Sequence, residues 1–309
     1  MSKISKEIEK QLKLDAPETD HGFIPTGLIP LDAALGGGLA KGKIAEIFGP
    51  ESSSKTTLCL TFAAEVQRSG GSVLFIDAEH AIDPRWAVKN GVDWDEFGII
   101  QPDNAEQALE AVELAIEMGV DLIIVDSVAA MTTKRELAGD LGDANVGDKA
   151  RLMSQMMRRL AGKANRSGST VVFINQIREK VGVMFGSPET TPGGRALKFT
   201  ASQRMDTRRV ESVKSGDVQT GVKIRVKVVK NKMAAPFRQA EYYIDFGLGV
   251  DRESTLLEYA IAQGVVQKSG AWVKYNDENI GQGMAKAADY LRAHPDVREE
   301  IERVMGLPS

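Results

Sequence analysis

The sequence has very little cysteine and histidine. Of its 309 residues, only Cys59 is a cysteine and three are histidines. A lone cysteine cannot form a disulfide within the chain, which excludes a disulfide-stapled fold and is typical of a reducing compartment. No Cys/His cluster is present that would indicate a zinc site. We expect Cys59 to be a small buried apolar side chain.

Long apolar runs are also missing. No stretch approaches the roughly 18 apolar residues that a membrane span requires. The first 14 residues alternate charged and apolar side chains, which indicates neither a signal peptide nor a membrane anchor. We therefore expect no membrane partner and a cytoplasmic location. Apolar residues make up 42% of the chain, enough for one sizeable core and a smaller second unit.

The charge of the chain is unevenly distributed. The net charge of −4 by itself indicates no polyanionic partner. However, residues 149–232 hold 19 Lys and Arg against 5 Asp and Glu, a net charge of +14, so the remainder carries −18. A basic segment in an acidic protein favours binding to an anionic partner. The alternative is a solvated surface that happens to be basic.

Short apolar runs alternate with amphipathic stretches through the first part of the chain. The runs predict strands at 44–48, 73–76, 99–100, 122–125 and 171–174. The amphipathic stretches predict helices at 3–14, within 26–38, and at 58–66, 84–90, 105–118 and 149–164, with a polar link at 15–25. Apolar strands that alternate with helices indicate an α/β fold whose mostly parallel sheet is covered on both faces.

The pattern changes after Gln203. Alternating residues predict strands at 203–210, 223–229 and 242–246 that extend the sheet in antiparallel fashion, and 223–229 has one buried and one basic face. Beyond residue 251, helical stretches at 254–263, 284–293 and 296–305 and a strand at 272–275 predict a small α+β domain. We divide the chain into an N-terminal helix and linker (1–25), a core (26–250) and a C-terminal domain (251–309).

The most informative stretch, GPESSSKTT, lies between a predicted strand and a predicted helix. That context is typical of a phosphate-binding loop, because the helix N-terminus offers unpaired N–H groups to a phosphate. Lys55 can reach the outer phosphates and the Thr56 hydroxyl can bind Mg²⁺. Ser54 replaces the second glycine of the motif, which costs little if it enters the helix at negative φ. The candidate nucleotide-binding residues are Gly49, Pro50, Glu51, Ser52, Ser53, Ser54, Lys55, Thr56 and Thr57. The alternative is an ordinary strand–loop–helix turn.

Polar residues follow the predicted strands at the edge that carries this loop. A nucleoside triphosphatase needs a carboxylate for Mg²⁺, a second carboxylate for the attacking water and a polar sensor of the γ-phosphate. Asp126 suits the first role, Glu79 the second and Gln176 the third; Asn175 lies at the same edge. Each of these residues taken alone is also common as a cap, but together they predict nucleotide hydrolysis.

The segment from Ile177 to Arg195 contains glycines, prolines and cations together with Met184 and Phe185. Loops of this length are uncommon in compact domains unless they are functional. Cations bind phosphates, and apolar or aromatic side chains stack on or wedge between bases. The segment therefore favours nucleic-acid binding, with a disordered surface loop as the alternative. A second glycine-containing loop at 138–146 has little charge and gives only a weak indication.

Six stretches, taken in chain order, resemble the bacterial RecA recombinase family. They are Gly49–Ser53, Phe75–Ala81, Val125–Ala130, Phe173–Arg178, Gly182–Gly186 and Val228–Phe237. The resemblance runs from about Thr26 to Met305. It implies a RecA-type phosphate-loop ATPase core and a helical filament on single-stranded DNA that catalyses pairing with homologous double-stranded DNA and strand exchange. ATP and Mg²⁺ would bind between protomers, and DNA would stimulate hydrolysis.

The resemblance also assigns roles to individual residues. Glu79 would activate the water, and Gln176 would link the γ-phosphate to the loop that holds Met184 and Phe185. The residues implied in hydrolysis are Lys55, Glu79, Gln176, and Lys230 and Lys232 from the neighbouring protomer. Those implied at the metal are Thr56 and Asp126, and those around the adenine are Asp83, Trp86 and Phe246. Those implied along the DNA are Arg151, Arg158, Arg178, Met184, Phe185, Gly193 and Gly194.

Some features depart from the family pattern. Ser54 replaces a glycine, Trp86 stands where a tyrosine is usual, and no acidic tail follows Met305. The compact ends and the altered loop suit a divergent member, which we hypothesise to be phage-encoded and to act in a bacterial cell. Two alternatives remain open: a RecA-fold helicase motor, and a DNA-binding regulator with weak or no ATP turnover, which only Ser54 supports.

Overall fold

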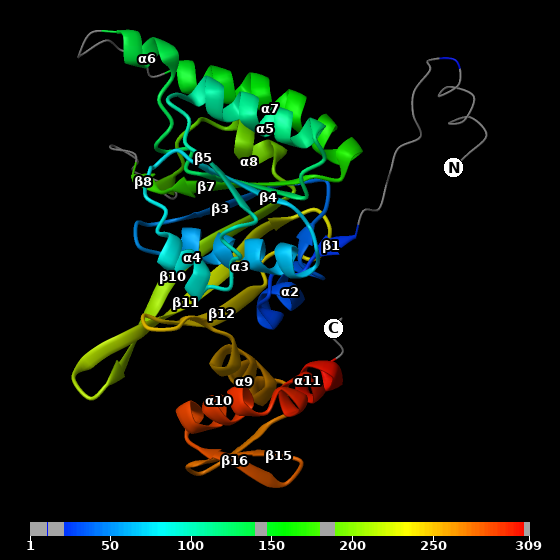
Figure 1. Ribbon diagram of the computed structural model, residues 1–309, viewed down its shortest axis with the longest axis vertical. Helices are drawn as coiled ribbons and strands as arrows, with labels where there is room; N and C mark the ends of the chain where they lie inside the picture. Colours follow the sequence, from blue (N-terminus) through cyan, green and yellow to red (C-terminus); the bar gives the residue numbers. More distant parts are fainter. Residues whose placement is uncertain (1–10, 12–21, 140–146, 180–188, 306–309) are drawn as a thin grey trace.

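The computed structural model describes residues 11, 22–139, 147–179 and 189–305. A nine-stranded sheet forms its centre (Figure 1). From one edge to the other, its strands are β13 (Gly249–Asp251), β12 (Gln239–Asp245), β11 (Val218–Asn231), β10 (Gln203–Ser215), β3 (Ile44–Gly49), β7 (Thr170–Gln176), β6 (Leu122–Asp126), β4 (Val73–Asp77) and β5 (Phe97–Ile100). The six strands from β10 to β5 are parallel, and β11 to β13 are added in antiparallel fashion. Both features of the predicted sheet are therefore confirmed.

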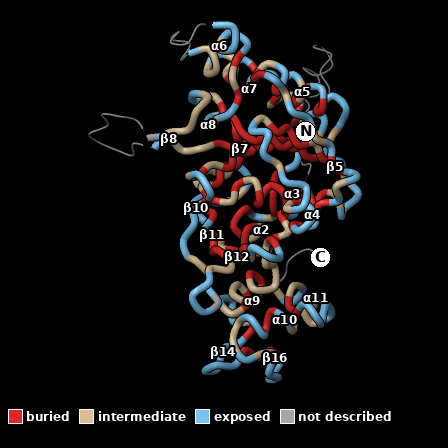
Figure 2. The backbone as a smooth tube through the Cα atoms, turned by 60° about the vertical axis from the view of Figure 1, so that its left-hand side comes forward, coloured by how far each residue is buried: buried red, intermediate tan, exposed pale blue. Residues whose placement is uncertain are grey.

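Helices cover both faces of the sheet (Figure 1). One face packs against α2 (Ile29–Leu35), α3 (Lys55–Arg68) and α4 (Pro84–Lys89). The other packs against α5 (Ala105–Glu117), α7 (Asp148–Ser167) and α8 (Ala196–Thr200). Figure 2 shows that the buried backbone follows the sheet and α3. Cys59 lies in α3 and is fully buried, as predicted.

Local signals set the ends of the helices that frame the site. Asp83 caps α4 because its side chain accepts a hydrogen bond from the N–H of Arg85, and Pro84 suits the first helical position. Asn104 caps α5 in the same way through Gln107 N–H. A capping box begins α6 (Lys134–Ala138), where the Thr133 and Glu136 side chains each bond the other's backbone N–H. These caps fix where each helix begins, and so they set the length of the strand-to-helix loops at the carboxyl edge of the sheet.

Several predicted boundaries are wrong. The helix expected from residue 58 begins at Lys55, directly after the loop. Within the expected polar link, Phe23–Ile24 forms β1, which pairs with β2 (Leu39–Ala40). The ribbon of β10 and β11 is longer than predicted and extends past the sheet (Figure 1). The helix predicted at 3–14 lies, apart from Gln11, outside the described residues, and so does most of the loop at 138–146.

The basic face predicted for β11 also needs correction. Val222, Ile224, Val226 and Val228 are buried as expected. Lys223, however, is only 8% exposed. Its Nζ lies 2.8 Å from Glu241 Oε2 and 2.7 Å from Glu258 Oε1. Its charge is therefore balanced within the protein, and it joins the sheet to the next unit, because Glu258 belongs to α9 (Arg252–Ala262).

A small α+β unit follows the sheet. Its elements are α9 (Arg252–Ala262), β14 (Gln267–Ser269), β15 (Trp272–Tyr275), β16 (Glu278–Gln282), α10 (Met284–Ala293) and α11 (Pro295–Val304). The three strands form their own antiparallel sheet, and a separate apolar cluster surrounds Leu257 and Leu291. The predicted α+β character is confirmed, while the exact domain boundaries stay a prediction. Throughout the described part of the chain, no helix combines the length and apolarity needed to cross a bilayer.

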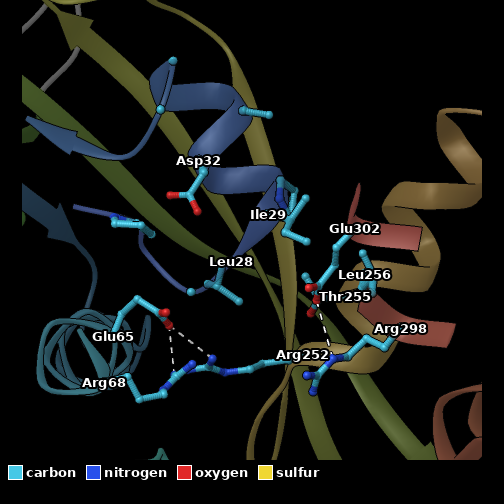
Figure 3. A pocket seen from close by; sticks show the side chains of 16 residues that line it. Leu28, Ile29, Asp32, Glu65, Arg68, Arg252, Thr255, Leu256, Arg298 and Glu302 are labelled. Atoms are coloured by element: carbon cyan, nitrogen blue, oxygen red, sulfur yellow. Dashed lines mark hydrogen bonds and ion pairs between the residues drawn. The ribbon is translucent and has the colours of Figure 1, made fainter. Parts of the chain in front are cut away.

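A cavity of about 420 Å³ lies where α9 and α11 meet α2 and α3 (Figure 3). Glu65 of α3 forms ion pairs with Arg252, at 3.4 Å, and with Arg68, at 2.9 Å. Burial lowers the pKa of Arg252. On the opposite wall, Asp32 accepts a hydrogen bond from Thr26 N–H at 2.8 Å, and burial raises its pKa to about 7. Part of the contact between the two units is therefore charged.

Asp32 predicts a pH dependence of stability. Because its folded pKa lies above the ordinary value of 3.8, its ionised form destabilises the fold, and the stability that its protonation provides is lost as pH rises from about 4 to 7. Asp32→Asn keeps an oxygen for Thr26 N–H but cannot ionise. We expect this variant to be more stable than the parent at pH 8 by on the order of 1 kcal/mol and nearly equal to it at pH 4, in urea titrations. Parallel pH profiles would contradict this assignment.

Candidate active site

The phosphate loop joins β3 to α3 and packs against Thr207 of β10. A Cβ added to Gly49 would lie 2.3 Å from Thr207 O, so only glycine fits there. The Ser53 hydroxyl donates to Pro50 O at 2.8 Å and shares a hydrogen bond with Thr207 Oγ1 at 2.9 Å. Thr207 is fully buried in β10. Buried hydrogen bonds and close backbone packing therefore fix the loop to β10.

Two serines in the loop adopt left-handed backbone conformations. Ser54 has a φ of +63° and Ser52 a φ of +56°. The condition under which serine would cost little here, a negative φ, is therefore not met. Ser54 is the N-cap of α3, but its hydroxyl makes no capping hydrogen bond. The serine thus carries the steric cost of this conformation, which glycine avoids, without the benefit of a cap.

Lys55 is buried at the start of α3 and turns back over the loop. Its Nζ donates to Pro50 O at 2.7 Å and to Gly49 O at 3.3 Å. Burial lowers its pKa, while the nearby carboxylates of Asp126 and Glu79 act in the opposite direction. The ammonium group therefore lies beside the backbone amides of the loop, where a phosphate would need a cation.

Thr56 and Asp126 form a pair of oxygen ligands. The Thr56 hydroxyl donates to Asp126 Oδ2 across the gap between α3 and β6. Burial raises the pKa of Asp126 to about 7, and the hydrogen bond from Thr56 opposes that shift. Within the described ranges, no group of three or more His, Cys, Asp or Glu side chains could hold a metal. Two protein oxygens fit Mg²⁺, which usually takes its other ligands from water and phosphate.

Glu79 and Gln176 meet at the same edge of the sheet. Gln176 Nε2 donates to Glu79 Oε1 at 3.2 Å, and the Ser127 hydroxyl donates to that same oxygen. The structure therefore brings together the expected base and the expected sensor. Sequence reasoning missed Ser127, although its position directly after Asp126, at the end of a buried strand, was the available signal. Backbone bonds from Ala78 and Glu79 N–H to Asp126 O fix the two strand ends to each other.

The three residues expected around the adenine lie at the start of α4 and directly after β12. Trp86 Nε1 donates to Thr57 Oγ1 at 3.1 Å, so the indole packs beside the phosphate-loop helix. Asp83 caps the helix that carries Trp86. Phe246 follows β12 and is 48% exposed. Their place around the adenine stays a prediction.

The described residues expected along DNA lie near α7. Arg151 and Arg158 are exposed on this helix, seven positions apart and so on one side. Gly193 and Gly194 have φ values of +83° and +78°, and a Cβ on Gly194 would lie 2.9 Å from Ala150 Cβ. Both glycines thus allow the chain to pass close to the start of α7. Arg178 is exposed in β8 (Arg178–Glu179), while Met184 and Phe185 lie outside the described residues.

Much of the charge of the basic segment is balanced by acids elsewhere in the fold. Arg159 pairs with Glu113 at 2.7 Å, and Arg204 pairs with Glu46 at 2.5 Å. Other cations of the segment that pair with acids outside it are Lys163, Lys223 and Arg225. The excess of +14 therefore overstates the charge available to a polyanion.

Lys230 and Lys232 are not near the phosphate loop of their own chain. Lys230 Nζ donates to Phe199 O at 2.8 Å and to Lys198 O at 3.0 Å, beyond the end of α8. Burial lowers the pKa of Lys230, and nearby Lys232 and Arg204 act in the same direction. Phe199 beside them is 66% exposed. These lysines therefore lie on a partly apolar surface.

Comparison with known proteins gives a consistent result over the whole chain. The family model described as the RecA N-terminal domain matches residues 1–251, and that of the RecA C-terminal domain matches residues 254–305. Protein RecA of Salinispora tropica is 52% identical over 291 residues, covering 94% of this chain and 84% of the relative. Protein RecA of Dichelobacter nodosus is 57% identical over 285 residues, covering 92% and 81%. Protein RecA of Cutibacterium acnes is 52% identical over 306 residues, covering 96% and 88%.

The backbone of Ser54 generates a prediction. Ser54→Gly relieves the left-handed strain and removes no capping bond, so we expect the protein to become more stable by about 0.5 to 1 kcal/mol in urea titrations. Ser53→Gly is the matched control. It removes the hydroxyl that bonds Pro50 and Thr207, and it should destabilise the protein. Equal losses of stability in both variants would show that Ser54 is not strained.

Proposed function

The chain belongs to the RecA family, and we propose that ATP and Mg²⁺ bound at residues 49–57 switch it into a filament that holds DNA. As a member of this family it is a homologous-recombination protein and a DNA-dependent ATPase. The observation that carries the proposal is the meeting of five side chains at one sheet edge. They are Lys55, Thr56, Glu79, Asp126 and Gln176.

Each of these side chains would have a distinct role. Mg²⁺-ATP supplies the γ-phosphate that is transferred to water. Lys55 would neutralise the outer phosphates, and Thr56 with Asp126 would hold the metal. Glu79 is the one carboxylate of this group that is exposed, so it would accept the proton of the attacking water. Trp86, close to Thr57, would cover one side of the base.

Gln176 would couple the nucleotide to DNA. Its backbone pairs with Gly49 of the phosphate loop in the parallel register of β3 and β7. Two residues later, Arg178 is exposed in β8, on the segment assigned to DNA. A change in the hydrogen-bond partner of Gln176 would therefore shift Arg178, because only Ile177 separates the two residues. The nucleotide would favour one of two positions of this segment rather than create a new one.

The filament and its nucleotide sites are further parts of the proposal. Lys230 and Lys232 lie away from the phosphate loop of their own chain and beside exposed Phe199. An ATP bound between protomers would give these lysines a phosphate to contact on the neighbouring protomer. Arg151, Arg158, Arg178, Gly193 and Gly194 would lie along the DNA. Region 1–25 would serve protomer contact, and region 26–250 would serve ATP hydrolysis and DNA binding, with 251–309 as a small C-terminal domain.

Substitution of Lys55 tests the proposal. Lys55→Ala removes the cation that lies over the loop, so we expect no measurable ATP binding in equilibrium dialysis and no ATP-dependent filaments on single-stranded DNA in electron micrographs. Lys41→Ala is the matched control. It removes an exposed lysine before β3, at the opposite end of that strand, and should leave both properties intact. Normal filaments from Lys55→Ala would contradict the proposal that ATP bound at this loop drives filament formation.

A further inference from the structure

Asn175 is a fully buried polar residue at the second-last position of β7, and the mechanism above leaves it without a role. Its Oδ1 accepts a hydrogen bond from Gln176 N–H at 3.0 Å. Its Nδ2 donates to Glu46 Oε1 at 3.2 Å and to Pro192 O at 3.1 Å. Both donor positions and one acceptor position of this amide are therefore used, and its contacts lie in three separate parts of the chain.

Two of these contacts are the ends of one segment. Gln176 ends β7 and leads into β8, and β8 pairs with β9 (Glu189–Thr190) in an antiparallel ribbon, with Arg178 opposite Thr190. Pro192 follows β9 and precedes Gly193 and Gly194. The side chain of Asn175 thus lies at the base of the β8–β9 ribbon and bonds the backbone on both of its sides.

The third contact is an anchor inside the sheet. Glu46 of β3 is fully buried, and its Oε2 accepts a hydrogen bond from Arg204 Nε of β10 at 2.5 Å. The guanidinium group lies 4.5 Å from the centre of the Phe48 ring. Removal of two charges from water is costly, so such a pair adds little stability over apolar side chains of similar size. What it does provide is a carboxylate with a fixed orientation.

The same anchor reaches the strand that carries Lys230. Arg204 lies directly opposite Lys230 in the register of β10 and β11. Glu46 and Arg204 are also among the charges that act on the pKa of Lys230. Asn175 therefore connects the sensor Gln176 with Pro192 and, through the Glu46–Arg204 pair, with the lysines assigned to the neighbouring nucleotide.

We propose that Asn175 is a positioning residue that fixes both ends of the β8–β9 ribbon to the buried Glu46–Arg204 pair, so that movement of Gln176 is passed to the DNA-binding residues. This inference rests on the proposed function of Gln176. Asn175 is fully buried and no part of it reaches the surface. It acts by holding the backbone of Gln176 and Pro192 at a constant spacing.

Asn175→Asp is the sharpest test because it changes no shape. The new carboxylate oxygen replaces Nδ2 and faces two acceptors, Glu46 Oε1 and Pro192 O. We expect trypsin to cut faster at Arg178 and Arg195 in protein without nucleotide. We also expect the stimulation of ATP hydrolysis by single-stranded DNA to fall about tenfold, with DNA-independent turnover retained, because two buried hydrogen bonds are lost.

A double variant separates the two bonds and guards against simple misfolding. Asn175→Asp combined with Glu46→Gln restores a donor between these positions and keeps one negative charge near Arg204, but it leaves the Pro192 contact broken. Stability in urea should recover, while fast cleavage and weak DNA stimulation should persist. Asn104→Ala, which removes the cap of α5 and none of the contacts of Asn175, is the control for lower stability alone and should keep normal DNA stimulation.

Each outcome has a distinct meaning. Normal cleavage and normal DNA stimulation in Asn175→Asp would overturn the inference, and so would full recovery of both in the double variant, because the ion pair alone would then suffice. A parent protein that hydrolyses ATP equally with and without DNA would instead overturn the proposed function, before any variant is compared.

Discussion

In a parallel sheet, every strand delivers its last residue to the same edge, and the chemistry of this chain depends on that constraint. β3 ends in the phosphate loop, β6 in Asp126, β7 in Gln176, and β4 is followed by Glu79. The hydrogen bonds of Thr56 to Asp126 and of Gln176 to Glu79 show how closely these ends meet. No long-range folding device is needed to assemble the site, because strand order alone places its parts together.

The sheet also contains groups that a purely apolar core would not need. Glu46 and Arg204 form a buried ion pair between β3 and β10, and Asn175 of β7 bonds the same carboxylate. Lys223 joins β11 to Glu258 of the C-terminal unit. Buried ion pairs of this kind add little stability over apolar side chains of similar size. They lie where the sheet must keep a constant spacing to a loop or to another unit.

Much of the fold could be predicted from periodicity, because a buried strand appears as a short apolar run and an amphipathic helix as apolar residues three or four positions apart. The positions of Glu79, Asp126 and Gln176 at one edge of the sheet could be predicted for the same reason, since each residue lies at or just after the end of an apolar run. Ser54 could not, because its left-handed backbone is set by the loop as a whole. The contacts of Lys223 and Asn175 could not be predicted either. Glu258, the partner of Lys223, lies far along the chain, and Pro192, the partner of Asn175, lies in an irregular segment. The net charge of residues 149–232 overstated the charge available to DNA, because acids such as Glu46 and Glu113 neutralise cations of this segment but lie outside it.

The central claim is that the nucleotide site and the DNA-binding segment are coupled through the end of β7. Steady-state ATP hydrolysis, measured with and without single-stranded DNA at low and moderate salt, tests it most directly. The account predicts turnover that rises strongly when DNA is added, and a stimulation that weakens as salt displaces the DNA. Firm DNA binding that leaves hydrolysis unchanged would contradict it.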